Sequence, residues 1–109
     1  MAWNNIFDKC TAENLHLNNA DESVLVGNNF HEVNYGGAED DPAIYATDSE
    51  YVICSHNRVR APTSAPTYCV ETGAGCDYWN IFGNDFRAYA TSAYDLTGAN
   101  NDTTVLNWT

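Results

Sequence analysis

The sequence predicts one mainly β domain of the α+β class: an antiparallel sheet of short strands with one or two short helices, stapled by disulfides. Three observations predict it. Apolar and polar residues alternate over short runs that Asn, Asp and Gly separate. The 109 residues fit a single domain over 1–109. The four cysteines form an even set without C-x-x-C spacing, which is typical of disulfides and not of a zinc site.

The N-terminal half predicts a short helix and two hairpins. Residues 2–10 are expected to be helical, because Trp3, Phe7 and Cys10 recur at helical spacing with Ile6 beside them. The runs at 14–18 and 24–26 are expected to pair as a hairpin, because Asn and Asp fill the connection between them. A second hairpin is expected between 43–46 and 51–55.

The C-terminal half predicts a loop, further strands and one helical turn. Residues 58–66 hold two arginines and two prolines and are expected to form an exposed loop. Strands are expected over 67–71 and 104–108, with another alternating segment over 86–94. Asp77 is expected to cap a helical turn that carries Trp79 and Phe82. No internal repeat is predicted.

Four cysteines permit three disulfide pairings, and the sequence cannot choose among them. Cys69 and Cys76 enclose a short Gly-rich turn, so we prefer that pair, which leaves Cys10 with Cys54. The alternative pairs Cys54 with Cys69 across neighbouring strands and Cys10 with Cys76. Either pairing indicates an oxidising compartment, so we expect an extracellular, cell-surface or periplasmic protein whose leader has been removed.

The charge is strongly acidic. Four basic residues against 15 acidic ones give a net charge of -11, which argues against nucleic acid and anionic membranes as partners. No apolar run is long enough to span a bilayer. Glu39, Asp40 and Asp41 are the candidates for a calcium site, although no EF-hand spacing is present. No cofactor and no metal site is expected otherwise.

No catalytic signature is present, so the chain is predicted not to be an enzyme. His16, His31 and His56 are scattered, without the spacing of metal ligands. No G-x-S-x-G motif surrounds a serine. A sugar site becomes possible wherever Tyr or Trp is exposed beside Asn and Asp.

The segment from Asp41 to Thr72 resembles the globular head of bacterial type IV pilins and pseudopilins. The resemblance lies in Ile44-Tyr45-Ala46, in Tyr51-Val52-Ile53-Cys54, and in Tyr68-Cys69-Val70-Glu71 after a Pro-containing loop. It implies a non-catalytic structural head of a surface filament or secretion pseudopilus. The partner would be a filament subunit with a hydrophobic helix, or a second copy, and Trp3, Ile6 and Phe7 are the candidate assembly surface.

The alternative function is a secreted carbohydrate-binding lectin or effector module. Phe7-Asp8-Lys9-Cys10 and Val105-Leu106-Asn107-Trp108 resemble the start and the end of a cyanovirin-type lectin repeat, although no internal duplication is seen. The resemblance implies carbohydrate as the partner.

Overall fold

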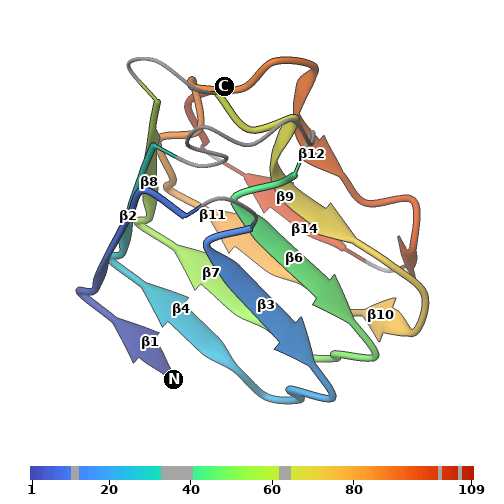
Figure 1. The fold of residues 1–109 in the computed structure, drawn as a ribbon. Helices are drawn as coiled ribbons and strands as arrows, with labels where there is room; N and C mark the ends of the chain where they lie inside the picture. The colour runs from blue at the N-terminus through green and yellow to red at the C-terminus, as the bar shows by residue number, and fades with distance from the viewer. Residues whose placement is uncertain (11–12, 33–40, 62–64, 101, 106) are drawn as a thin grey trace.

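The computed structural model is a parallel β-solenoid, in which successive turns of the chain stack and pair strand upon strand (Figure 1). It describes residues 1–10, 13–32, 41–61, 65–100, 102–105 and 107–109. These residues contain no helix, and every pair of neighbouring strands among them is parallel. The predicted α+β class and antiparallel sheet are therefore wrong.

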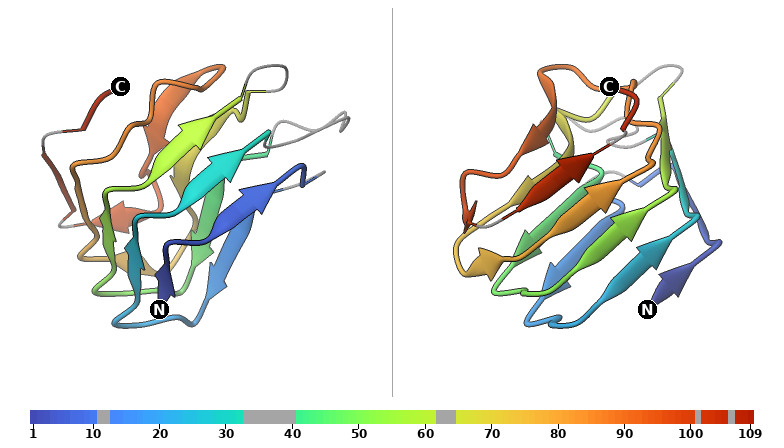
Figure 2. Two further views of the ribbon diagram at one scale, coloured as in Figure 1. Left: turned by 90° about the vertical axis from the view of Figure 1, so that its left-hand side faces the viewer. Right: turned by 180° about the vertical axis from the view of Figure 1, so that it is seen from behind.

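Three parallel sheets run along the solenoid, and each turn of the chain is called a rung below (Figure 2). The first sheet contains β1 (Ala2–Trp3), β4 (Val24–Val26), β7 (Ile53–Ser55), β11 (Asn80–Phe82) and β14 (Thr103–Val105). The second contains β2 (Ile6–Asp8), β5 (Asn29–His31) and β8 (Arg58–Arg60). The third contains β3 (Leu15–Asn18), β6 (Ile44–Thr47), β9 (Tyr68–Thr72) and β12 (Ser92–Asp95). A short fourth pair joins β10 (Cys76–Asp77) to β13 (Ala99–Asn100).

The core lies inside the three sheets and is built of stacks, one residue from each rung. Leu25 lies in register with Cys54, and Cys54 with Ile81, and all three are buried. Phe7 stacks on Phe30 with ring centroids 4.9 Å apart and the planes inclined by 7°. Like side chains pack well in such stacks because neighbouring parallel strands lie about 4.8 Å apart. The core therefore depends on side chains that fit those at the same position in the next rung, and not on side chains paired across a hairpin.

The predicted N-terminal helix and both hairpins are wrong. Residues 2–10 contain the separate strands β1 and β2, which lie in different sheets. The strand β3 pairs with β6 of the next rung instead of turning back onto β4, and β6 pairs with β3 and β9 instead of β7. The polar segments that suggested hairpin turns are corners at which the chain passes to the next sheet. The capped turn expected from Asp77 is likewise part of β10 and the approach to β11.

The disulfide prediction is also wrong, because Cys10, Cys54, Cys69 and Cys76 are all free. Cys54, Cys69 and Cys76 are buried in the hydrophobic core, where each packs as a small apolar side chain. Neither the preferred pairing nor its alternative forms.

The pilin-like interpretation is also wrong, because it depended on an antiparallel meander that the structure does not contain. Its segments correspond to β6, β7 and β9, and β7 belongs to a different sheet from the other two. Strands that looked like successive arms of one antiparallel sheet are instead successive sides of a solenoid.

Candidate functional site

One corner of the solenoid, between the first and second sheets, repeats from rung to rung. The chain turns there through a residue in the left-handed region: Asn4 (φ 51°), Gly27 (φ 68°), His56 (φ 54°) and Gly83 (φ 64°). An asparagine follows each of them, and another occupies the same place in the last rung. These five residues, here called the asparagine ladder, are Asn5, Asn28, Asn57, Asn84 and Asn107.

The asparagine ladder supplies hydrogen bonds where the corner interrupts the strands. Asn57 Nδ2 donates to the carbonyl oxygen of Leu25 at 2.9 Å, and Asn57 Oδ1 accepts from the backbone N–H of Asn28 at 2.9 Å. Asn84 repeats both bonds one rung later, to the carbonyl of Cys54 and from the N–H of Asn57. Buried backbone groups need such partners, so the ladder has a structural role.

The residue after each ladder asparagine is different in every rung. These residues, here called the outer column, are Ile6, Asn29, Arg58, Asp85 and Trp108. Trp108 is 66% exposed and Ile6 is 75% exposed. The outer column therefore follows the same axis as the asparagine ladder but carries varied chemistry on the surface.

An open groove follows the outer column from β8 to the last rung. Its wider part has a volume of about 490 Å³ and is lined by His56, Asn57, Arg58, Gly83, Asn84, Asp85, Arg87 and Trp108. An adjoining hollow of about 360 Å³ shares Arg58, Asp85 and Arg87 and adds Val59, Arg60, Ala61 and Ala88. The two hollows together are called the arginine groove. Its floor is formed partly by ladder residues, so the ladder fixes the position of the groove.

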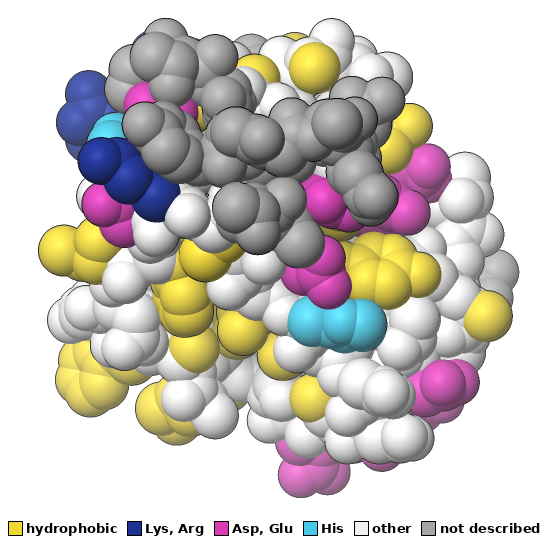
Figure 3. All heavy atoms as spheres, in the orientation of Figure 1, with side chains coloured by type: hydrophobic (Ala, Val, Ile, Leu, Met, Phe, Trp, Pro, Cys, Tyr) yellow, Lys and Arg dark blue, Asp and Glu magenta, His cyan; other side chains and the backbone are white. Residues whose placement is uncertain are grey.

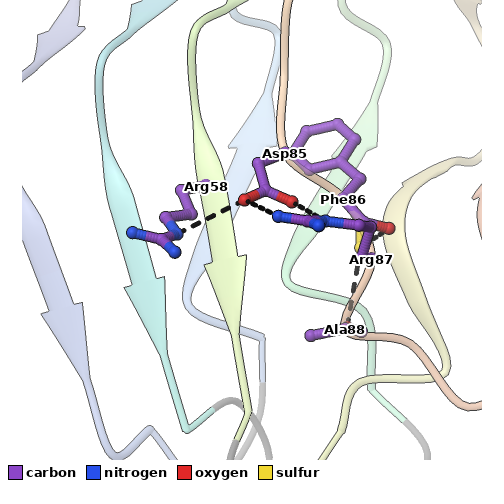
Figure 4. Close-up of polar contacts among 6 residues, drawn as sticks. Arg58, Asp85, Phe86, Arg87 and Ala88 are labelled. Carbon is purple, nitrogen blue, oxygen red and sulfur yellow. Dashed lines mark hydrogen bonds and ion pairs between the residues drawn. The ribbon is translucent and has the colours of Figure 1, made fainter. Parts of the chain in front are cut away.

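Asp85 lies between two arginines in this groove (Figure 4). Arg87 donates two hydrogen bonds to it, from Nε to Oδ1 at 2.7 Å and from Nη2 to Oδ2 at 2.9 Å. Arg58 Nε lies 3.4 Å from Oδ2 on the other side. The hydrogen bonds from Arg87, and then the charges of both arginines, hold the pKa of the Asp85 carboxyl below its usual range, although partial burial opposes this shift.

The arginines nevertheless keep exposed surface. The side chains of Arg58 and Arg87 are 49% and 59% exposed, and the Arg87 guanidinium lies 5.3 Å from the ring centroid of Trp108. At that distance the cation is attracted to the aromatic face. The groove thus combines a tryptophan, two amides, a histidine and three cations with a single carboxylate among its lining residues.

The structure does not bring the residues expected to form an assembly surface into this groove. Trp3 and Ile6 are 65% and 75% exposed on the first rung, whereas Phe7 is half-buried against Phe30. Asp41 is described and lies beside a separate hollow, while Glu39 and Asp40 lie outside the described residues. Within the described ranges no three His, Cys, Asp or Glu side chains are grouped so that they could hold a metal ion.

The three histidines stay apart, and of them only His56 lines the groove. His31 Nδ1 lies 2.7 Å from Asp8 Oδ1, and His16 Nδ1 lies 3.1 Å from Glu13 Oε1. The described part of the chain also holds no helix long and apolar enough to cross a membrane.

The sequence did contain a signal for the groove. Gly27-Asn28-Asn29-Phe30 and Gly83-Asn84-Asp85-Phe86 are the same motif, and Asn4-Asn5-Ile6-Phe7 is close to it. The ladder spacings of 23, 29, 27 and 23 residues are too irregular for a fixed-period search to find. No family model, curated protein or solved structure matches the chain.

Proposed function

We propose that this chain is a non-catalytic carbohydrate-binding module that holds a glycan chain in the arginine groove. The observation that carries the proposal is the exposed indole of Trp108, which lies beside guanidinium and imidazole groups in one open groove. An aromatic ring packs against the apolar face of a sugar, while polar side chains hydrogen-bond its hydroxyls.

The shape of the groove also favours a chain of repeating units. The two hollows share three residues and together extend from Ala61 to Trp108 along the outer column. Solenoids present extended surfaces of this kind because each rung places a similar position beside the last.

The charges of the groove favour binding over catalysis. Glycoside hydrolysis generally uses two carboxyl groups, one of which acts as an acid. Among the described lining residues of the arginine groove, Asp85 is the one carboxylate. Its two arginine partners stabilise the ionised form, so it is a poor proton donor near neutral pH.

A glycan array followed by calorimetric titration tests the proposal, with Trp108→Ala as the variant. The matched control is Trp3→Ala, because Trp3 is 65% exposed and Trp108 is 66% exposed but Trp3 lies outside the groove. We expect binding that Trp108→Ala weakens about twofold to tenfold and Trp3→Ala leaves unchanged, because a stacked aromatic ring contributes roughly 0.5–1.5 kcal/mol. An array without any bound glycan would reject the proposal.

A structural or assembly role is the second candidate. Trp3 and Ile6 are exposed on β1 and β2, and both strands are edges of their sheets. Edge strands with apolar side chains are templates for pairing with another chain. Sedimentation of the wild type and Trp3→Lys tests this role: a concentration-dependent oligomer that the variant abolishes would support it, and a monomer throughout would reject it.

We also propose that the protein is extracellular, because its proposed ligand is. The disulfide argument for it no longer holds because the cysteines are free. Its support is now the proposed ligand, since glycan chains are components of cell surfaces and their surroundings. Antibody detection in separated envelope and cytosolic fractions tests this location.

A further inference from the structure

We infer that the glycan held by the arginine groove is anionic, with carboxylate or sulfate groups that the arginines of the groove bind. The inference rests on the proposed carbohydrate function and names its substrate class. Three of the four basic residues of the chain line this groove, although the net charge of the whole chain is -11.

The solenoid register brings these cations together. Arg58 and Arg60 are two residues apart on β8, so their side chains leave the same side of the strand. Both are exposed, while Val59 between them is buried. Arg87 comes from the next rung, because Asp85 pairs with Arg58 in the adjoining strand position. The three guanidinium groups therefore lie on one outer face.

Their chemistry suits an oxyanion. A guanidinium group offers several N–H donors in a planar fork that matches a carboxylate or a sulfate. Asp85 occupies part of the fork of Arg87 and contacts Arg58, and it thereby fixes where both groups point (Figure 4). Arg60 lines the second hollow, so three cations face one carboxylate within the groove. One of the three positive charges offsets the Asp85 carboxylate, so the lining of the groove keeps a net positive charge.

Figure 3 shows Lys and Arg side chains at the upper left, over β2 and β8, with Asp and Glu side chains directly beside them and at other places on that face. At physiological salt the Debye length is about 8 Å, so acidic groups on other faces are largely screened from a ligand in the groove. Local contacts with the arginines then outweigh the repulsion by the net charge.

Four forms of one polymer test the inference by calorimetric titration: chondroitin, chondroitin sulfate, and the methyl ester of each. Chondroitin carries carboxylate alone, esterified chondroitin sulfate carries sulfate alone, and esterified chondroitin carries neither. Dextran and dextran sulfate repeat the comparison on a second backbone. Binding of the charged forms, with at least tenfold weaker binding of the neutral ones, is expected, and the carboxylate and sulfate arms identify the group that is bound.

The matched variants are Arg60→Gln and Lys9→Gln. Each removes one positive charge, but Lys9 follows β2 and does not line the groove. We expect Arg60→Gln to lower the affinity roughly tenfold, as the loss of a charge-assisted hydrogen bond does, and Lys9→Gln to change it less than twofold. Equal losses in the two variants would overturn a local site.

The possible failures separate the two proposals. Binding of neutral glycans alone, sensitive to Trp108→Ala, would overturn the anionic ligand and leave the carbohydrate function standing. If neither these polymers nor any array glycan binds, both proposals fall. Equal binding of a single-stranded oligonucleotide would show affinity for polyanions in general and would also overturn the inference.

Discussion

The asparagine ladder and the outer column are neighbours in sequence and in space, yet they follow opposite rules. The ladder position holds asparagine in every rung, from Asn5 to Asn107. The next position holds an aliphatic, an amide, a cationic, an anionic and an aromatic residue in turn. The ladder asparagines hydrogen-bond to the backbone of the corner, whereas the side chains of the outer column point outward.

This difference separates what the fold requires from what it permits. A left-handed corner leaves backbone groups that only a short amide side chain reaches in both directions, as donor and as acceptor. The outer column carries no such demand, so each rung can carry a different side chain there. The arginine groove, which we propose as the binding site, lies along this column.

The substitution Asn57→Ala is expected to have the largest effect on stability, because it removes a central member of the asparagine ladder. The change removes the acceptor of the Asn28 backbone N–H and one donor to the Leu25 carbonyl oxygen. A buried group left without a partner costs about 1–3 kcal/mol, so the free energy of unfolding should fall by roughly 2–3 kcal/mol. Urea unfolding followed by circular dichroism measures this loss.

The control is Asn80→Ala on β11, where the asparagine is exposed. We expect its effect on the free energy of unfolding to stay within about 0.5 kcal/mol. Similar losses in the two variants would show that the ladder has no special role.

Alkaline pH is expected to destabilise the protein through titratable side chains buried in its interior. Burial raises the pKa of the Cys54 thiol to about 12, and burial likewise raises the pKa values of Cys69 and Tyr94. The folded state keeps these groups neutral, whereas the unfolded chain ionises them near their usual values. Their stabilisation is thus complete below about pH 8.5 and is lost as the pH rises towards 12.

Urea midpoints at about pH 8 and about pH 10.5 measure this effect, and they should fall with pH. Cys54→Ala should make the fall shallower than in the wild type, because it removes one of the buried thiols. A fall as steep as that of the wild type would contradict the assignment to this thiol.

Asp85→Asn has the smallest expected effect on stability, because it changes the outer column alone. The ion pairs with Arg58 and Arg87 are partly exposed, so their loss should cost less than about 1 kcal/mol. Since these partners lower the Asp85 pKa, their contribution is present above the usual carboxyl range and disappears as the pH falls below about 4. Thermal unfolding of both proteins at pH 7 and pH 3 checks the difference and its loss; a drop as large as that of Asn57→Ala would place Asp85 in the structural framework.

The sequence alone located about half of the strands that the structure describes, but not their partners. Leu15 and Leu17 alternate with His16 and Asn18, and β3 shows that alternation in its burial. The strands expected at 24–26, 43–46, 51–55 and 67–71 likewise overlap β4, β6, β7 and β9. Alternation reports which face of a strand is buried, and it is the same for parallel and antiparallel neighbours. A polar segment between two strands was therefore read as a hairpin turn where the chain turns a corner.

The candidate site could be predicted only in part. The sequence could not say which aromatic residues would be exposed, and the structure places Trp108, which is 66% exposed, in the arginine groove. Arg58 and Arg60 were expected in a loop, whereas they form β8, and Arg87 was not connected to them. Their meeting depends on the register between rungs, which irregular spacing conceals.

The amino-acid sequence alone showed the acidic net charge, about half of the short strands and the polar segments at two of the corners, because charge, alternation and turn chemistry act over a few neighbouring residues. The tertiary structure alone decided that the strands stack in parallel, that the cysteines stay free in the core, and that Arg58, Asp85, Arg87 and Trp108 share one groove. The physical reason is that these features arise from contacts between residues more than twenty positions apart, which form only when one rung packs upon the next.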